Sequence, residues 1–193
     1  EQRDYLEMIK QSADDLFTLL CGMLDFSKSR EGQFRLERIP FSPTDVLEQA
    51  VAAASEAAEE KKLSIATEVN GPMPDLVVGD PARLRQVLGI LVDNGVKFTE
   101  KGGVTIALEA GVPCDGEVVL ELSVTDTGIG IDEERCAGLF DAFTRSGELP
   151  DRRTDGAGLG LALARQVVTR MGGTIEVESK RHQGSCFRFN LRF

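Results

Sequence analysis

The chain lacks tryptophan and has a single tyrosine and a single histidine among its 193 residues. Enzymes with a serine or cysteine nucleophile usually rely on a histidine base, so these arrangements are excluded unless His182 serves. The four cysteines are far apart and form no CxxC pair, which indicates neither a zinc site nor a disulfide framework. This cysteine pattern favours a reducing, cytoplasmic location.

Long hydrophobic runs and an excess of basic residues are also missing. No apolar run approaches the roughly 20 residues that a membrane span needs, so we expect no contact with a membrane. Lysine and arginine number 22 against 32 acidic residues, and the net charge is −10. Nucleic-acid binding is not expected, because neutralising phosphates needs a basic face. With 41% apolar and 28% charged residues, the composition is that of an ordinary globular protein.

Apolar residues near the start of the chain recur at the spacing of a packed helix. Over residues 1–29 they lie alternately three and four positions apart, which is typical of the seam between paired helices. The seam consists of Leu6, Ile9, Ala13, Leu16, Leu20 and Met23. We expect this helix to form a homodimer, and packing against its own domain is the alternative. Residues 27–39 lose the period and indicate a linker or a short extended stretch.

Residues 40–193 show helix and strand patterns in separate runs. Ser42-Pro43 and Asp80-Pro81 are typical helix starts, with a capping side chain followed by proline at the first helical position. Helices are expected at 43–62, from 81 onward, at 133–139 and at 159–171, and strands at 63–69, 104–108, 118–124, 174–179 and 185–193. These runs predict an α+β fold, a two-layer sandwich of one mixed sheet with helices on one face.

Three polar motifs follow one another in this second part. Asn94 and Lys97 share one helix face, which suits a metal-bound polyphosphate. Asp126-x-Gly128-x-Gly130 comes directly after a strand, where the carboxylate can accept a hydrogen bond from an amine and the glycines allow close approach to a ligand. Each motif alone also fits a structural role, either a solvated helix end or a plain turn.

The third motif is a glycine loop that opens a helix. It carries Gly156, Gly158 and Gly160, and the unpaired amides at such a helix start form an anion site. A dinucleotide-binding fingerprint is excluded, because that motif follows the first strand of a βαβ unit and this loop precedes an antiparallel hairpin.

The three motifs, together with the phenylalanine pair Phe140 and Phe143, resemble in order and spacing the ATP-binding domain of sensor histidine kinases. That family belongs to the superfamily of Hsp90, DNA gyrase B and MutL. The resemblance covers residues 40–193, and residues 1–39 are similar to the second helix of that family's dimerisation hairpin plus a linker.

The resemblance implies a role for each matching residue. Asn94 would ligate Mg²⁺, Lys97 would meet phosphate, and Asp126 would accept the amine of adenine. Gly128 and Gly130 would contact the base. The phosphates would be contacted by Arg145, Gly156, Gly158, Leu159 and Gly160. Residues 141–157 would form a mobile lid. The implied function is to bind Mg-ATP and supply the phosphoryl group for histidine autophosphorylation, with a response-regulator receiver domain as partner.

Two departures from the family pattern qualify this reading. Ile90 stands where the family has a polar residue, and isoleucine can neither bind metal nor take a proton. No phosphoacceptor box precedes Glu1, so we expect no autophosphorylation by this chain alone, and His182 is interpreted as a structural residue of a polar turn. The alternatives are an ATPase of the gyrase or Hsp90 kind and a nucleotide-binding module without catalysis.

Overall fold

The computed structural model describes residues 35–141 and 159–193. The predicted N-terminal helix and nearly all of the predicted lid lie outside these residues, as do Arg145, Gly156 and Gly158. The dimer and the lid stay predictions.

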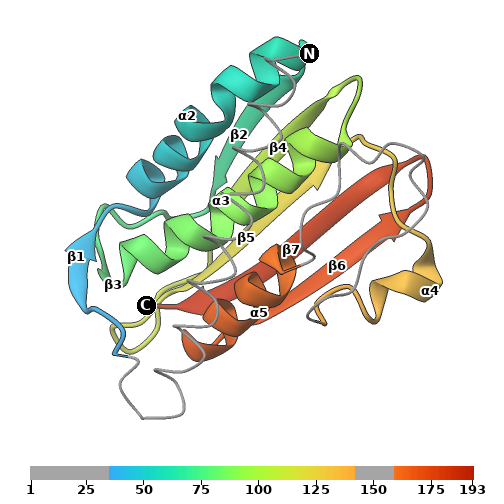
Figure 1. Cartoon of the computed structure of the whole chain (residues 1–193). Helices are drawn as coiled ribbons and strands as arrows, with labels where there is room; N and C mark the ends of the chain where they lie inside the picture. The colour runs from blue at the N-terminus through green and yellow to red at the C-terminus, as the bar shows by residue number, and fades with distance from the viewer. Residues whose placement is uncertain (1–34, 142–158) are drawn as a thin grey trace.

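A five-stranded sheet forms one layer of the molecule (Figure 1). Its strands, in spatial order, are β2 (Ser64–Asn70), β4 (Gly103–Ala110), β5 (Val119–Asp126), β7 (Gly184–Arg192) and β6 (Thr174–Lys180). β2 runs parallel to β4, and the other neighbours are antiparallel. The sheet is therefore mixed, as the sequence predicts.

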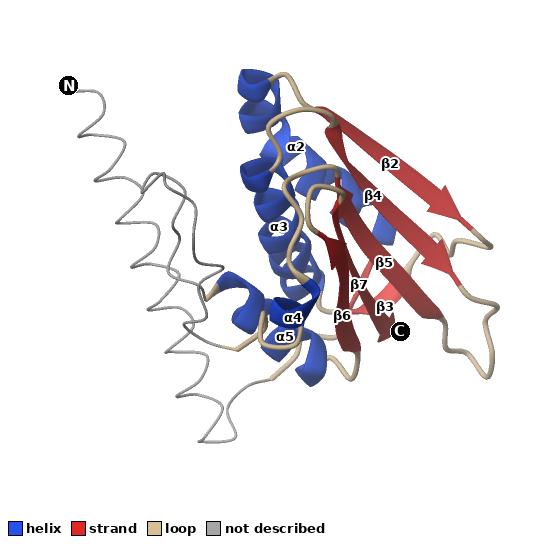
Figure 2. Cartoon of the chain, turned by 90° about the vertical axis from the view of Figure 1, so that its right-hand side faces the viewer, coloured by secondary structure: helices blue, strands red, loops and turns tan. Residues whose placement is uncertain are grey.

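Three helices cover one face of this sheet, and no helix of the described residues covers the other (Figure 2). They are α2 (Pro43–Lys61), α3 (Pro81–Phe98) and α5 (Gly160–Arg170). The predicted starts are confirmed: Ser42 accepts a hydrogen bond from Asp45 N, and Asp80 accepts one from Arg83 N at 3.0 Å. The α+β sandwich with helices on one face is thus confirmed.

Two details of the fold differ from the sequence prediction. Strands β1 (Ile39–Phe41) and β3 (Val77–Gly79) pair in a separate two-stranded sheet that was not predicted. Helix α4 (Glu133–Cys136) is shorter than the predicted 133–139, and the following residues form turns closed by hydrogen bonds such as Leu139 N to Cys136 O. These bonds join residues three positions apart, as in successive turns, rather than the four positions that would continue an α-helix.

The hydrophobic core lies between α3 and the centre of the sheet. Its largest fully buried side chains come from α2, α3, β4, β5 and β7: Leu47, Leu84, Leu88, Leu91, Ile106, Leu108, Leu120, Leu122, Phe189 and Leu191. α3 crosses the sheet closely at Gly95, where a methyl group would lie 3.6 Å from the Asp126 Cβ. This packing sets the C-terminal turn of α3 beside the end of β5, and the polar motifs of the two elements come together there.

Candidate functional site

A cavity of about 210 Å³ opens where the C-terminal end of α3, the loop after β5 and the β6–β7 turn meet. Its apolar lining consists of Phe98, Ile129, Ile131, Leu139, Leu161 and Phe187. Apolar atoms make up the larger part of the lining surface, and the polar side chains are those of Asn94, Asp126, Asp132, Arg135, Arg181, His182 and Ser185. A mainly apolar cavity with a few convergent polar groups is the usual form of a small-molecule site.

Asp126, the last residue of β5, is the most buried charged group of this cavity, with 6% of its surface exposed. Its Oδ1 accepts a hydrogen bond from Gly128 N at 2.8 Å, and the backbone and hydroxyl of Ser185 also bond to the carboxylate. Burial raises the pKa of the Asp126 carboxyl, and these hydrogen bonds act in the opposite direction. The carboxylate is thus fixed in orientation on the cavity wall.

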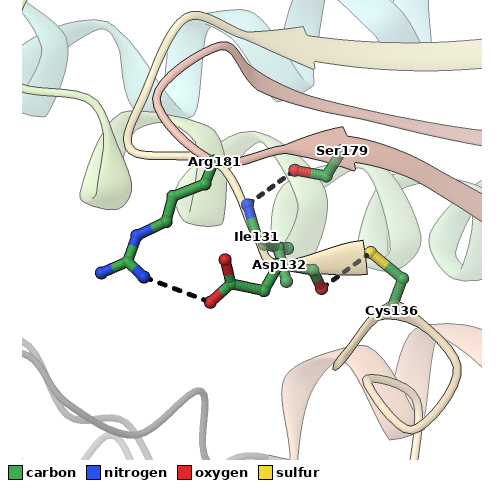
Figure 3. Close-up of polar contacts among 5 residues, drawn as sticks. All are labelled: Ile131, Asp132, Cys136, Ser179 and Arg181. Carbon is green, nitrogen blue, oxygen red and sulfur yellow. Dashed lines mark hydrogen bonds and ion pairs between the residues drawn. The ribbon is translucent and has the colours of Figure 1, made fainter. Parts of the chain in front are cut away.

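Ser185 belongs to a hydrogen-bond network that the sequence did not reveal. It lies opposite Asp126 in the β5–β7 register, and its Oγ is 3.0 Å from Ser179 Oγ. Ser179 Oγ also accepts from Ile131 N at 2.8 Å, as Figure 3 shows. The network ties the loop after β5 to the final hairpin. The Arg181–Asp132 ion pair in the same view, at 3.6 Å, is exposed and adds little.

The two glycines of the Asp126 motif are required by packing within the protein. A methyl group at Gly128 would overlap the Phe98 carbonyl at the end of α3. At Gly130 it would overlap the Lys180 carbonyl, and the backbone there has a φ of 65°, which favours glycine. Only Gly130 of the pair lines the cavity. The sequence predicts that these glycines give a ligand access. The structure adds a second reason for glycine, because the loop after β5 lies close to the end of α3 and to the final hairpin.

Asn94 lines the cavity, whereas Lys97, one turn further along α3, does not. Lys97 Nζ lies 5.4 Å from the centroid of the Phe98 ring. The end of α3 is held by a residue that the sequence did not single out: Lys61 Nζ donates to Val96 O at 2.7 Å and to Lys97 O at 2.8 Å. Burial lowers the pKa of Lys61, and Lys97 lowers it further while Glu100 raises it.

Leu159 and Gly160 stand at the start of α5, as the sequence predicts, and no side-chain hydrogen bond caps that helix. Neither residue lines the cavity, although the next one, Leu161, does. Ile90 packs against this helix start, because a methyl group at Gly160 would lie 3.2 Å from the Ile90 Cγ2. An apolar side chain therefore occupies the space between α3 and the first turn of α5.

His182 lies in the β6–β7 turn, as predicted, but it also lines the cavity. Its interpretation as a structural residue stays a prediction. The turn is brought to the cavity by a hydrogen bond from His182 N to Ile129 O of 2.6 Å. This contact between distant segments depends on how β5 and β7 pair.

No group of three histidine, cysteine, aspartate or glutamate side chains within 35–141 and 159–193 is placed to hold a metal ion. No helix in the same ranges is long and apolar enough to cross a membrane.

Residues 79–193 match the family model described as histidine kinase-, DNA gyrase B-, and HSP90-like ATPase. The chain belongs to this family. It is 38% identical over 190 residues to the signal transduction histidine-protein kinase BarA of Escherichia coli (strain K12), and 37% identical over 191 residues to the sensor protein GacS of Pseudomonas syringae pv. syringae. These alignments cover 98% and 99% of the chain but only 21% of each relative, so the chain spans about a fifth of their length.

Solved structures agree with the family assignment. The crystal structure of full-length ShkA in complex with AMPPNP superposes with a TM-score of 0.77 at 36% identity, covering 99% of this chain and 38% of ShkA. Histidine kinase ThkA in complex with the response regulator protein TrrA gives a TM-score of 0.72 at 23% identity, covering 100% of this chain and 51% of ThkA, and supports the fold alone. The expected histidine kinase ATPase fold is confirmed.

Proposed function

We propose that the cavity binds the adenine base of ATP or ADP. The observation that carries this proposal is Asp126, a buried carboxylate fixed on the wall of a mainly apolar cavity. A carboxylate accepts a hydrogen bond from the exocyclic amine of adenine and repels the carbonyl oxygen that guanine has there. Membership of an ATPase family and the likeness to ShkA, which was solved with AMPPNP, support the assignment.

Calorimetric titration with ADP and GDP tests the proposal. With GDP the carboxylate would keep its bonds from Gly128 and Ser185 but would lack the donor that adenine supplies. An unpaired buried acceptor position costs about 1–3 kcal/mol, so we expect ADP to bind roughly 5- to 150-fold more tightly than GDP. Asp126→Ala should remove this discrimination and most of the affinity. Asp132→Ala is the matched control, because Asp132 lines the same cavity but is only partly buried and is paired with Arg181. Equal affinity for ADP and GDP, or unchanged ADP binding by Asp126→Ala, would contradict the assignment.

On the phosphate side we propose that Asn94 supplies an oxygen ligand to Mg²⁺ and that Lys97 attracts the phosphates. Asn94 fits this role because its amide, a hard oxygen donor, lines the cavity. A magnesium ion that bridges ATP takes most of its other ligands from phosphate and water, so one protein ligand is sufficient. The backbone amides at Leu159 and Gly160, with Gly156, Gly158 and Arg145, complete the proposed phosphate contacts. Asn94→Ala should abolish any gain in ATP affinity on adding Mg²⁺, with ADP binding in EDTA unchanged.

For the whole protein we propose transfer of the γ-phosphoryl group of ATP to a histidine in two-component signalling. The names of BarA and GacS support this reaction. The domain of residues 40–193 contributes positioning and charge stabilisation, residues 1–39 pair two copies of the chain, and a receiver domain accepts the phosphoryl group. Incubating the full-length protein with γ-labelled ATP should give acid-labile label that Asp126→Ala removes; absence of such label would contradict the reaction.

A nucleotide-binding module without phosphoryl transfer is the second candidate, and Ile90 favours it. Its side chain is packed against the start of α5, where the resemblance calls for a polar group. Ile90→Asn distinguishes the candidates: if label is absent from the parent protein and appears in the variant, the binding module is supported. Labelling of the parent protein would exclude it.

A further inference from the structure

Three non-glycine residues in the described part of the chain have a positive φ: Lys62 at 58°, Asp115 at 53° and His182 at 64°. Two of them have ordinary explanations. Lys62 is the C-cap of α2, where its N–H bonds to Ala58 O and Glu59 O, and Asp115 lies in the exposed turn between β4 and β5, where aspartate is tolerated. His182 is the one of the three that lines the cavity.

The backbone around His182 is held on both sides. His182 N donates to Ile129 O at 2.6 Å, and Gln183 N donates to Lys180 O at 2.9 Å. Glycine would adopt this left-handed conformation without the steric cost that a side chain brings. A strained non-glycine residue at a cavity is a reason to ask what its side chain does there.

The position of His182 relates it to Asp126. The turn that carries His182 leads directly into β7, whose second residue, Ser185, bonds to the Asp126 carboxylate. His182 and Asp126 therefore belong to one wall of the cavity, and both line it. An imidazole offers a flat face, a donor and an acceptor, and a purine base presents a flat face and ring nitrogens to match them.

We propose that His182 is a nucleotide-binding residue that contacts the purine base. This inference rests on the proposed binding of adenine nucleotides in the cavity. It gives the single histidine of the chain a role in affinity, outside the motifs built on Asn94, Asp126 and the glycine loop. On this proposal, the strained left-handed backbone at His182 lowers stability, and the imidazole improves nucleotide binding in return.

Two substitutions separate a binding role from a structural one. His182→Gly removes the imidazole and relieves the backbone, so we expect an equal or higher melting temperature together with at least a fivefold weaker affinity for ADP. His182→Asn keeps a polar residue that tolerates positive φ, and it should also weaken ADP binding. Asp115→Gly is the matched control: it relieves the same conformation far from the cavity and should leave ADP affinity unchanged.

Measuring ADP and ATP side by side locates the contact. Contact with the base predicts the same fold-loss for both nucleotides. A loss confined to ATP would place His182 at the phosphates and overturn the proposal, as would unchanged ADP affinity in both variants, or a loss in His182→Gly that His182→Asn does not share. Failure of the unaltered chain to bind ADP would instead refute the proposed function itself.

Discussion

Replacing Gly130 by alanine tests how the loop after β5 is held against the final hairpin. The alanine has two costs. It must adopt a φ of 65°, and its methyl group would overlap the carbonyl of Lys180 and lie 3.1 Å from the Arg181 Cα. Both contacts are with backbone, so no side-chain rotation relieves them and the hairpin or the loop must move.

The magnitude follows from these two costs. A side chain in the left-handed region costs roughly 1–2 kcal/mol, and forcing extra volume into a packed region adds roughly 1–3 kcal/mol, so Gly130→Ala should lower the free energy of unfolding by about 2–5 kcal/mol. Gly116 is the control: its φ is 81°, but no described atom lies within 4 Å of an added methyl group. Gly116→Ala should therefore lose only about 1–2 kcal/mol.

Urea unfolding followed by circular dichroism measures the difference, since the chain has no tryptophan for a fluorescence assay. Because Gly130 lines the cavity, its variant should also bind ADP more weakly, while Gly116→Ala should bind normally. Equal losses of stability in the two variants would refute the account of the packing between Gly130 and Lys180.

Three further outcomes are expected. Gly89→Ala should raise the free energy of unfolding by about 0.5–1 kcal/mol in a denaturant titration, because Gly89 is inside α3 and no described atom lies within 4 Å of the added methyl group. Lys61→Met, which keeps the apolar stem but not the ammonium on the last α3 carbonyls, should lower it by about 1 kcal/mol, with Lys62→Met as the control. Asp126→Asn should raise the melting temperature of the free protein. Because burial raises the pKa of Asp126 in the folded state, ionisation of this carboxyl destabilises the folded protein as pH rises through that pKa. The stability advantage of the asparagine variant should therefore grow from pH 4 to pH 7. An advantage that is constant with pH would contradict the last of these.

Local signals explain why most of the fold could be predicted. The capping side chains of Ser42 and Asp80 bond to backbone N–H groups only three residues away, and β4 and β5 alternate clearly between buried and more exposed residues. β1 and β3 were not predicted because each has three residues, too few to show a period. They also form only when Ile39–Phe41 pairs with Val77–Gly79. Their existence depends on a contact between segments far apart in the sequence.

The difference between local sequence signals and contacts of distant segments also explains which site residues could be predicted. Asn94, Asp126 and Gly130 stand in recognisable motifs, and the structure brings all three to one cavity. Ser185 and His182 reach it only because Asp126 pairs with Ser185 in the β5–β7 register. Apolar lining residues such as Phe98 and Phe187 could not be told from core residues, because burial and cavity lining require the same side chains.

A nitrogen-15 NMR titration of the chain with ADP tests the central claim most directly, since the backbone amides of the cavity wall report binding one residue at a time. The account predicts that the largest shifts fall on Gly128, Gly130, His182 and Ser185, and that the remote turn at Asp115 and Gly116 is unaffected. Shifts concentrated elsewhere, or none at millimolar ADP, would contradict the assignment of this cavity as the nucleotide site.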